Sequence, residues 1–516
     1  MLHRQGGQSG SQGIYPIAVA LLIAACMLMV SCVNGNRELS EAEQSAFSTY
    51  VDSLDVDLKG QWFDRMGVST DADSLLSYMR HELSRNGLDT TAFFVPQIAE
   101  DLDIVHKLAF DSLGVNINEV LKRLDDNLTE AFVSYTIGQR YGFVRPDKLL
   151  NRLNMKPDSS GYARLFDYDI ESPDEKEARG KVSSSDRMEY LLASQPKNNI
   201  YRTLQTRLAN TSDKALRQKI AVNMERCRWR INHPEGNQRM ILVNIAAQQL
   251  WAVCPDSVLN MKICCGATTT KTPLLNSTIN YIQVNPEWII PNNIIKTDVA
   301  RHAGDSAYFA RNNYYIINRS TGDTLNPVKV SSSELKSGSM RVGQRGGAGN
   351  SLGRIVFRFP NNFSVYLHDT NNRGAFSRER RTLSHGCVRV QKPFELACFL
   401  IPEIDDWTKD KLRISMDIHP ETERGLIYIS EHADAPRPFR LSTYHDVNPR
   451  VPVYIVYFTV YPNPETGEID TYPDIYGYDK VITDEMKTLL RSWIFTTISI
   501  CKSYCQKLKP NVKVLS

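Results

Sequence analysis

The stretch Leu383–Val390, LSHGCVRV, holds the residues of this chain that are best suited to covalent chemistry. Cys387 can act as a nucleophile only as a thiolate, so it needs a nearby group that takes its proton. Gly386 lets the chain turn tightly and bring backbone N–H groups towards a reacting carbonyl oxygen. The stretch therefore predicts a cysteine nucleophile beside an oxyanion hole.

Two histidines could act as the base for Cys387. His385 is close in the sequence, but a side chain two residues before the nucleophile need not point at the sulfur. His368 ends a predicted strand in which apolar and polar residues alternate, and that strand could lie next to the cysteine. The residues alone leave both histidines open as the base.

The segment Tyr366–Val390, YLHDTNNRGAFSRERRTLSHGCVRV, resembles the signature of the L,D-transpeptidase catalytic domain of the YkuD type. That signature has a His, a loop, and then Ser-x-Gly-Cys-x-Arg. The resemblance, which extends to the large YcbB-like branch of these enzymes, implies that His368 is the base and Cys387 the nucleophile. It also implies that Asp369 orients the histidine ring through its backbone carbonyl.

Three further residues are expected to face the substrate. Arg389 matches the arginine that supports the site or binds a substrate carboxylate in the family that the segment resembles. His385 then falls at the variable position before Gly-Cys, near the substrate and not as the base. Tyr366 is expected to pack in the domain and to line the groove.

The resemblance implies peptidoglycan stem peptides as substrates and no cofactor. Cys387 would attack the carbonyl between the L and D centres of a tetrapeptide stem, and an amine of a second stem would resolve the acyl-enzyme into a 3-3 cross-link. Such an activity serves cell-wall biogenesis and cell shape. Transfer to water would make an L,D-carboxypeptidase, and a chain without catalysis would be a wall-binding lipoprotein. A papain-like peptidase would need the cysteine well before the histidine.

The N-terminal segment Gln5–Asn36 has no charged residue, and its apolar core at Ile14–Val30 is typical of a membrane-directed signal. LMVSC, ending at Cys32, resembles a lipobox, and LIAAC, ending at Cys26, competes with it. We favour Cys32 because cleavage at Cys26 would leave the apolar Met27–Val30 on the mature protein. The alternative is an uncleaved anchor helix. The sequence thus predicts a membrane-anchored lipoprotein of the cell envelope that faces the periplasm.

The overall composition favours neither a nucleic-acid partner nor a metal site. The chain has 61 Lys and Arg against 58 Asp and Glu, a net charge of +3, which gives no argument for nucleic-acid binding. Its 10 cysteines include no CxxC and no paired Cys/His spacing, so we expect no metal centre. The sequence gives no indication of the oligomeric state.

The hydrophobic period changes along the chain. Apolar residues recur at helical spacing up to about residue 230, apart from a polar stretch at 169–187 that we expect to be a linker or an exposed insertion. From residue 239, β-branched and apolar runs separated by turns predict a sheet. The polar, glycine-rich residues 293–346 interrupt it as an insertion.

These observations, together with the family resemblance, which implies the scaffold and capping roles, predict an α+β fold with four parts. Residues 1–32 form the signal and lipobox, and residues 33–235 a helical scaffold domain. Residues 236–424 form a mostly β catalytic domain that contains an inserted capping subdomain at about 293–346. Residues 425–516 form a C-terminal β segment and tail.

Overall fold

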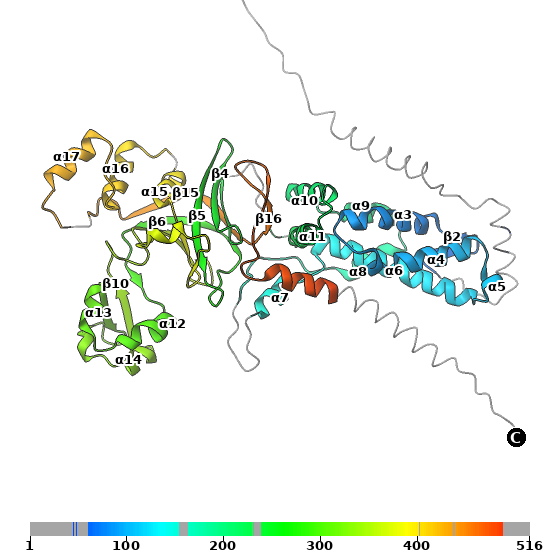
Figure 1. Ribbon diagram of the computed structural model, residues 1–516, viewed down its shortest axis with the longest axis horizontal. Coiled ribbons are helices and arrows are strands. Elements are labelled where there is room, and N and C mark those ends of the chain that lie inside the picture. Colours follow the sequence, from blue (N-terminus) through cyan, green and yellow to red (C-terminus); the bar gives the residue numbers. More distant parts are fainter. Residues whose placement is uncertain are drawn as a thin grey trace, which may run out of the picture.

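The computed structural model describes residues 60–153, 164–229, 239–401, 403–436 and 439–488, and the single residues 45, 48 and 231. A helical part and a mostly β part lie end to end, and a smaller unit projects from the β part (Figure 1). The predicted α+β class, with a helical part before a mostly β part, is confirmed. The predicted signal segment, with Cys26 and Cys32, lies outside the described residues.

The helical part is built around the long helix α6 (Ile117–Tyr141). Its apolar face is buried against α4 (Val95–His106) and other helices, and the Asn116 side chain caps its first turn. The other principal helices are α3 (Thr70–Arg85), α10 (Asn199–Ala209) and α11 (Lys214–Arg228). Shorter helices are α5 (Phe110–Leu113), α7 (Pro146–Arg152), α8 (Glu175–Val182) and α9 (Arg187–Ala193).

Residues 169–187, expected to be a linker or an exposed insertion, contain the helix α8, so the linker interpretation is wrong. Ala178 and Val182, four residues apart, are buried where α8 packs on α6. The remaining residues of α8 are polar and face solvent. Two apolar contacts on a surface helix are too few to stand out in the sequence.

The β part is one closed sheet of nine strands. Its order is β13-β5-β14-β12-β11-β6-β15-β3-β4, and β4 also pairs with β5, so the sheet closes on itself. The strands are β3 (Met240–Asn244), β4 (Gln249–Cys254), β5 (Ser257–Gly266), β6 (Leu275–Val284), β11 (Ile355–Arg358), β12 (Leu367–His368), β13 (Thr382–Ser384), β14 (Val388–Val390) and β15 (Tyr444–Val456).

The predicted boundary between residues 236–424 and the C-terminal segment 425–516 does not coincide with the end of this sheet. Strand β15 lies beyond it, yet it pairs with β6 on one side and β3 on the other, and its Val451, Val453 and Ile455 are buried in the core. Three helices fill the chain between β14 and β15, namely α15 (Pro393–Leu400), α16 (Asp406–Ser415) and α17 (Glu423–Glu431). Because this connection is long, the sequence does not indicate that β15 pairs with the strands before it.

The inserted subdomain, here called the cap, has its own sheet and core. Its strands are β7 (Trp288–Ile289), β8 (Tyr314–Asn318), β9 (Thr324–Leu325) and β10 (Met340–Gln344), in the order β7-β10-β8-β9. Helices α12 (Asn292–Ile294), α13 (Ser306–Arg311) and α14 (Ser332–Ser337) cover them around buried Phe309, Ile316 and Val342. The cap sheet begins at Trp288, slightly before the predicted start at residue 293.

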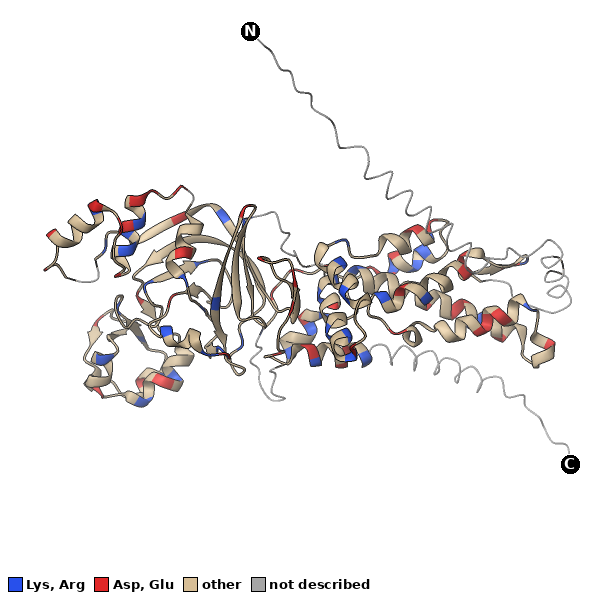
Figure 2. Cartoon of the chain, turned by 45° about the horizontal axis from the view of Figure 1, so that its top comes forward, with Lys and Arg blue, Asp and Glu red and all other residues tan. Residues whose placement is uncertain are grey.

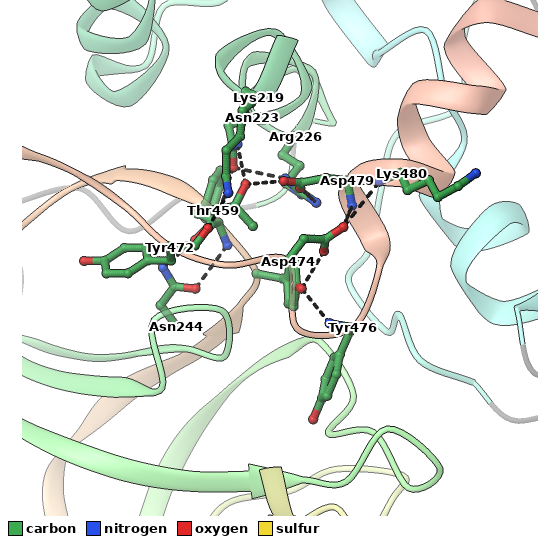
Figure 3. A network of polar contacts seen from close by, with 12 residues as sticks. Lys219, Asn223, Arg226, Asn244, Thr459, Tyr472, Asp474, Tyr476, Asp479 and Lys480 are labelled. Atoms are coloured by element: carbon green, nitrogen blue, oxygen red, sulfur yellow. Dashed lines mark hydrogen bonds and ion pairs between the residues drawn. The ribbon is translucent and has the colours of Figure 1, made fainter. Parts of the chain in front are cut away.

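The C-terminal hairpin of β16 (Val460–Pro462) and β17 (Ile469–Thr471) joins the helical and β parts. Figure 3 shows polar side chains from both parts meeting there. Arg226 of α11 forms an ion pair of 2.7 Å with Asp479, and Asn223 exchanges hydrogen bonds with Thr459. The two parts are thereby held in one arrangement.

Basic and acidic residues are interspersed along both parts of the chain (Figure 2). Recognition of a charged ligand must therefore come from local groups. Within the described residues, no helix is both long enough and apolar enough to span a membrane.

We expect the Arg226–Asp479 ion pair to stabilise the junction between the helical and β parts. Arg226 is buried and Asp479 is mostly buried, with 4% and 14% of their side-chain surface exposed, so Arg226→Ala leaves the carboxylate with the Thr459 hydroxyl but without its charged partner. We expect a loss of about 3–5 kcal/mol in the free energy of unfolding, measured by urea denaturation. Lys107→Ala, which breaks an exposed pair with Asp103, serves as the control and should cost about 1 kcal/mol or less. Equal losses for the two variants would refute the role of the junction.

Candidate active site

A pocket of about 810 Å³ lies between the cap and the sheet. His368, Cys387, Tyr366, His385 and Arg389, all predicted from the sequence, line it together. The cap contributes the opposite wall with Trp288, Asp298, Tyr308, Tyr314 and Arg319. A substrate in this pocket would touch both units.

The pairing of β12 with β14 brings the histidine and the cysteine together. These strands run parallel, with Leu367 opposite Val388 and His368 opposite Arg389. The Val388 N–H donates to the Tyr366 carbonyl oxygen at 3.0 Å, which fixes the chain just after Cys387. The pairing thus brings His368 and Cys387 into one pocket although they are 19 residues apart in the sequence.

His368 is buried, and its Nδ1 lies 2.5 Å from the carbonyl oxygen of Asp369. This is the contact that the family resemblance implies for Asp369. Because a carbonyl oxygen only accepts, Nδ1 carries the proton and Nε2 keeps its lone pair. Burial, and then the positive charge of Arg389, lowers the pKa of His368 to about 4, so the ring is neutral at pH 7.

The Asp369 side chain stabilises the backbone that carries this carbonyl. Its Oδ2 accepts from the Arg354 N–H at 2.9 Å, and its Oδ1 lies 3.0 Å from Nη2 of Arg373. Gly353 packs against the same carboxylate, where a Cβ atom would come within 2.5 Å of it. The orienting carbonyl therefore belongs to a rigid part of the chain.

The Cys387 thiol is half-buried in the pocket wall. Its Sγ lies 3.7 Å from the carbonyl oxygen of Ser364, which can accept the thiol proton. Burial raises the pKa of Cys387, and the charges of Arg358 and Arg389 oppose that rise only in part. Cys387 and His368 therefore both rest in their neutral forms.

The turn before Cys387 is fixed by Ser384 and Gly386. The Ser384 hydroxyl donates to the Cys387 carbonyl oxygen at 2.5 Å and accepts from the Gly386 N–H at 3.2 Å. Gly386 has φ +119, a conformation that a side chain would strain. Its N–H is used within the turn, whereas the Cys387 N–H has no hydrogen-bond partner among the described residues. An oxyanion would therefore be met by the Cys387 N–H, in a turn that Gly386 shapes.

Two arginines present positive charge to the pocket. The Arg389 side chain makes no hydrogen bond or ion pair with the residues that the structure describes. Arg358 lies 4.1 Å above the ring of Tyr366 and donates to Gln283 at 3.3 Å. Sequence reasoning missed Arg358, although its polar position in the otherwise apolar strand β11 was a signal.

His385 lies at the mouth of the pocket and not at its floor. Its side chain is 54% exposed, and its Nε2 lies 3.7 Å from Oδ2 of Asp298 in the cap. The contact joins the catalytic turn to the cap. Among the described residues, no group of three or more His, Cys, Asp or Glu side chains could hold a metal ion.

Comparison with known families agrees with this geometry. Residues 238–403 match the family of the L,D-transpeptidase catalytic domain, named YkuD, and residues 57–208 match the Scaffold domain. The chain contains an L,D-transpeptidase catalytic domain.

A protein of Haemophilus influenzae named "Putative L,D-transpeptidase" is 28% identical to this chain over 369 residues. That alignment covers 69% of this chain and 69% of the relative. The similarity therefore includes more than the catalytic domain. The resemblance predicted from the cysteine segment is confirmed at the level of the domain and of its scaffold.

The neutral resting pair makes a prediction for the pH dependence of the L,D-transpeptidase domain. Because the pKa of Cys387 is raised and that of His368 is lowered to about 4, thiolate forms only as the pH rises. The rate of alkylation by iodoacetamide should therefore increase continuously from about pH 6 to about pH 9. Intact mass measures this rate, and the Cys387→Ala variant corrects for other cysteines. A plateau at neutral pH would instead indicate a thiolate–imidazolium pair.

Proposed function

We propose that this chain forms 3-3 cross-links in peptidoglycan through an acyl-enzyme on Cys387. The observation that carries the proposal is the shared pocket of a half-buried thiol and a buried histidine whose Nδ1 is held by the Asp369 carbonyl oxygen. The L,D-transpeptidase family of the domain supplies the substrate class.

In the first step, His368 accepts the thiol proton as Sγ attacks the carbonyl at the L centre of the third stem residue. The Sγ–C bond forms, the C–N bond to the terminal D-alanine breaks, and His368 gives its proton to the leaving amine. The Cys387 N–H would stabilise the tetrahedral oxyanion, and such a donor contributes about 10²–10³-fold to the rate.

In the second step, the amine of another stem attacks the thioester. His368 takes the proton of that amine, the new C–N bond forms, and Cys387 leaves as thiol. Water in place of the amine would give L,D-carboxypeptidase activity with the same residues.

The charges of the pocket suit the two substrates. Arg389 and Arg358, on the floor beside the thiol, have no carboxylate partner among the described residues and would bind a stem carboxylate of the donor. On the cap side, Asp298 and Glu287 line the pocket with negative charge and would attract the cationic amine of the acceptor.

A test of the nucleophile uses intact mass after incubation with a carbapenem, whose strained amide acylates a thiolate. Wild-type protein should gain one adduct, and Cys387→Ala should gain none and lose cross-linking of sacculi. His368→Ala should slow acylation by about 10²–10⁴-fold.

The matched control for this test is Cys254→Ala. The Cys254 thiol lies outside the pocket, and a hydrogen bond with Ser257 lowers its pKa, so it is the competing reactive thiol. This variant should keep the adduct. An adduct that persists in Cys387→Ala would overturn the assignment of the nucleophile. No adduct on the wild-type protein would instead indicate a non-catalytic wall-binding protein.

We also propose that the protein is anchored to a membrane of the cell envelope by a lipid on Cys32 and faces the periplasm. The support is the lipobox-like LMVSC sequence, after which the apolar run ends and the chain continues as VNGNRE. Cells labelled with radioactive palmitate should label the wild type and Cys26→Ala but not Cys32→Ala. The reverse pattern would place the lipid on Cys26, and label on neither protein would indicate an uncleaved anchor.

A further inference from the structure

The loop that connects β5 to β6 supports the catalytic turn from behind. The carbonyl oxygen of Ser384 accepts from the Ala267 N–H and from the Thr270 hydroxyl, both at 2.9 Å. The carbonyl oxygen of Gly386 accepts from the Thr272 hydroxyl at 2.8 Å. The loop thus supplies hydrogen-bond donors on both sides of His385.

The Thr272 side chain, which donates to the Gly386 carbonyl oxygen, is itself fixed by its surroundings. It is fully buried, and its hydroxyl also accepts from the Gly266 N–H at 2.9 Å. The loop closes so closely over Gly266 that a Cβ atom there would lie 2.1 Å from the Thr270 carbonyl oxygen. The direction of the Thr272 hydroxyl is therefore set by the loop.

Tyr476, from the C-terminal segment, closes this loop. Its hydroxyl donates to the Gly266 carbonyl oxygen at 2.6 Å and accepts from the Thr272 N–H at 3.2 Å, so it bridges the two ends of the loop. The Tyr476 N–H donates to Tyr457, whose hydroxyl donates to Asp474 at 2.7 Å. Figure 3 shows Asp474 and Tyr476 on the turn that leads to Asp479.

The Gly386 carbonyl and the Cys387 N–H belong to one peptide unit. Because a trans peptide is planar, its C=O and N–H point in opposite directions, so fixing one direction fixes the other. A hydrogen bond accepted by the carbonyl also polarises the N–H of the same unit and makes it a better donor. The Thr272 hydroxyl therefore determines where the Cys387 N–H points and how strongly it donates.

We infer that Thr272 and Tyr476 are positioning residues for the oxyanion hole of this enzyme. Thr272 orients the Gly386–Cys387 peptide, and Tyr476 holds Thr272 in place from the C-terminal segment. The inference rests on the proposed cysteine mechanism. If Tyr476 positions Thr272 in this way, the C-terminal segment takes part in acyl transfer.

Two reactions of the same thiol test the inference. Acylation by a carbapenem passes through an oxyanion, whereas alkylation by iodoacetamide does not. Thr272→Val and Tyr476→Phe should slow acylation about 10–10²-fold, since a misaligned donor costs less than a deleted one. Alkylation of Cys387 should keep its wild-type rate and pH profile. Thr272→Ser, which keeps the hydroxyl, should restore acylation.

Tyr478→Phe is the matched control. Tyr478 is a fully buried neighbour of Tyr476, and its hydroxyl has no hydrogen-bond partner among the described residues. Its loss should change neither reaction. Wild-type acylation rates in Thr272→Val, or a parallel fall in acylation and alkylation, would overturn the inference. Failure of the wild type to acylate at Cys387 would instead refute the proposed function.

Discussion

Two residue pairs, Leu367 with Val388 and His368 with Arg389, hold β12 parallel to β14, and the site takes its geometry from this short pairing. Neighbouring parallel strands cannot be joined by a tight turn, so the chain must cross over between them. The crossover here contains the 3-10 turn η5 (Arg373–Ser377) and β13. It returns the chain to the edge of β12 with Cys387 just before its strand begins.

The crossover also explains why the catalytic turn needs external support. A turn with φ +119 at Gly386 is held by few bonds of its own, namely those through Ser384. Two carbonyl oxygens of the turn, those of Ser384 and Gly386, accept hydrogen bonds from the loop between β5 and β6, whose Thr272 is buried against Tyr476 of the C-terminal segment. Buried backbone groups must find such partners, and their number makes the turn rigid.

The sequence predicts those parts of the site that are local. His368, Cys387 and Gly386 lie in one segment with a specific motif, and the cap shows as a polar interruption of the sheet. Tyr476 could not be predicted, because its hydroxyl meets a carbonyl 210 residues earlier in the chain. A tyrosine near the end of the chain carries no sign of its partner. The position of β15 in the sheet could not be predicted for the same reason, since strand pairing over a long connection depends on the whole fold.

Burial decides the charge state in which the site rests. A thiolate and an imidazolium in this pocket would each lose hydration, and their mutual attraction would have to offset that cost. Arg389 and Arg358 add positive charge beside the histidine, which disfavours imidazolium further. A neutral pair avoids both penalties and needs only one proton to move when the substrate carbonyl arrives. In the proposed mechanism the charge then develops on the oxyanion, which the Cys387 N–H would meet, and the arginines that oppose imidazolium at rest would favour that negative charge.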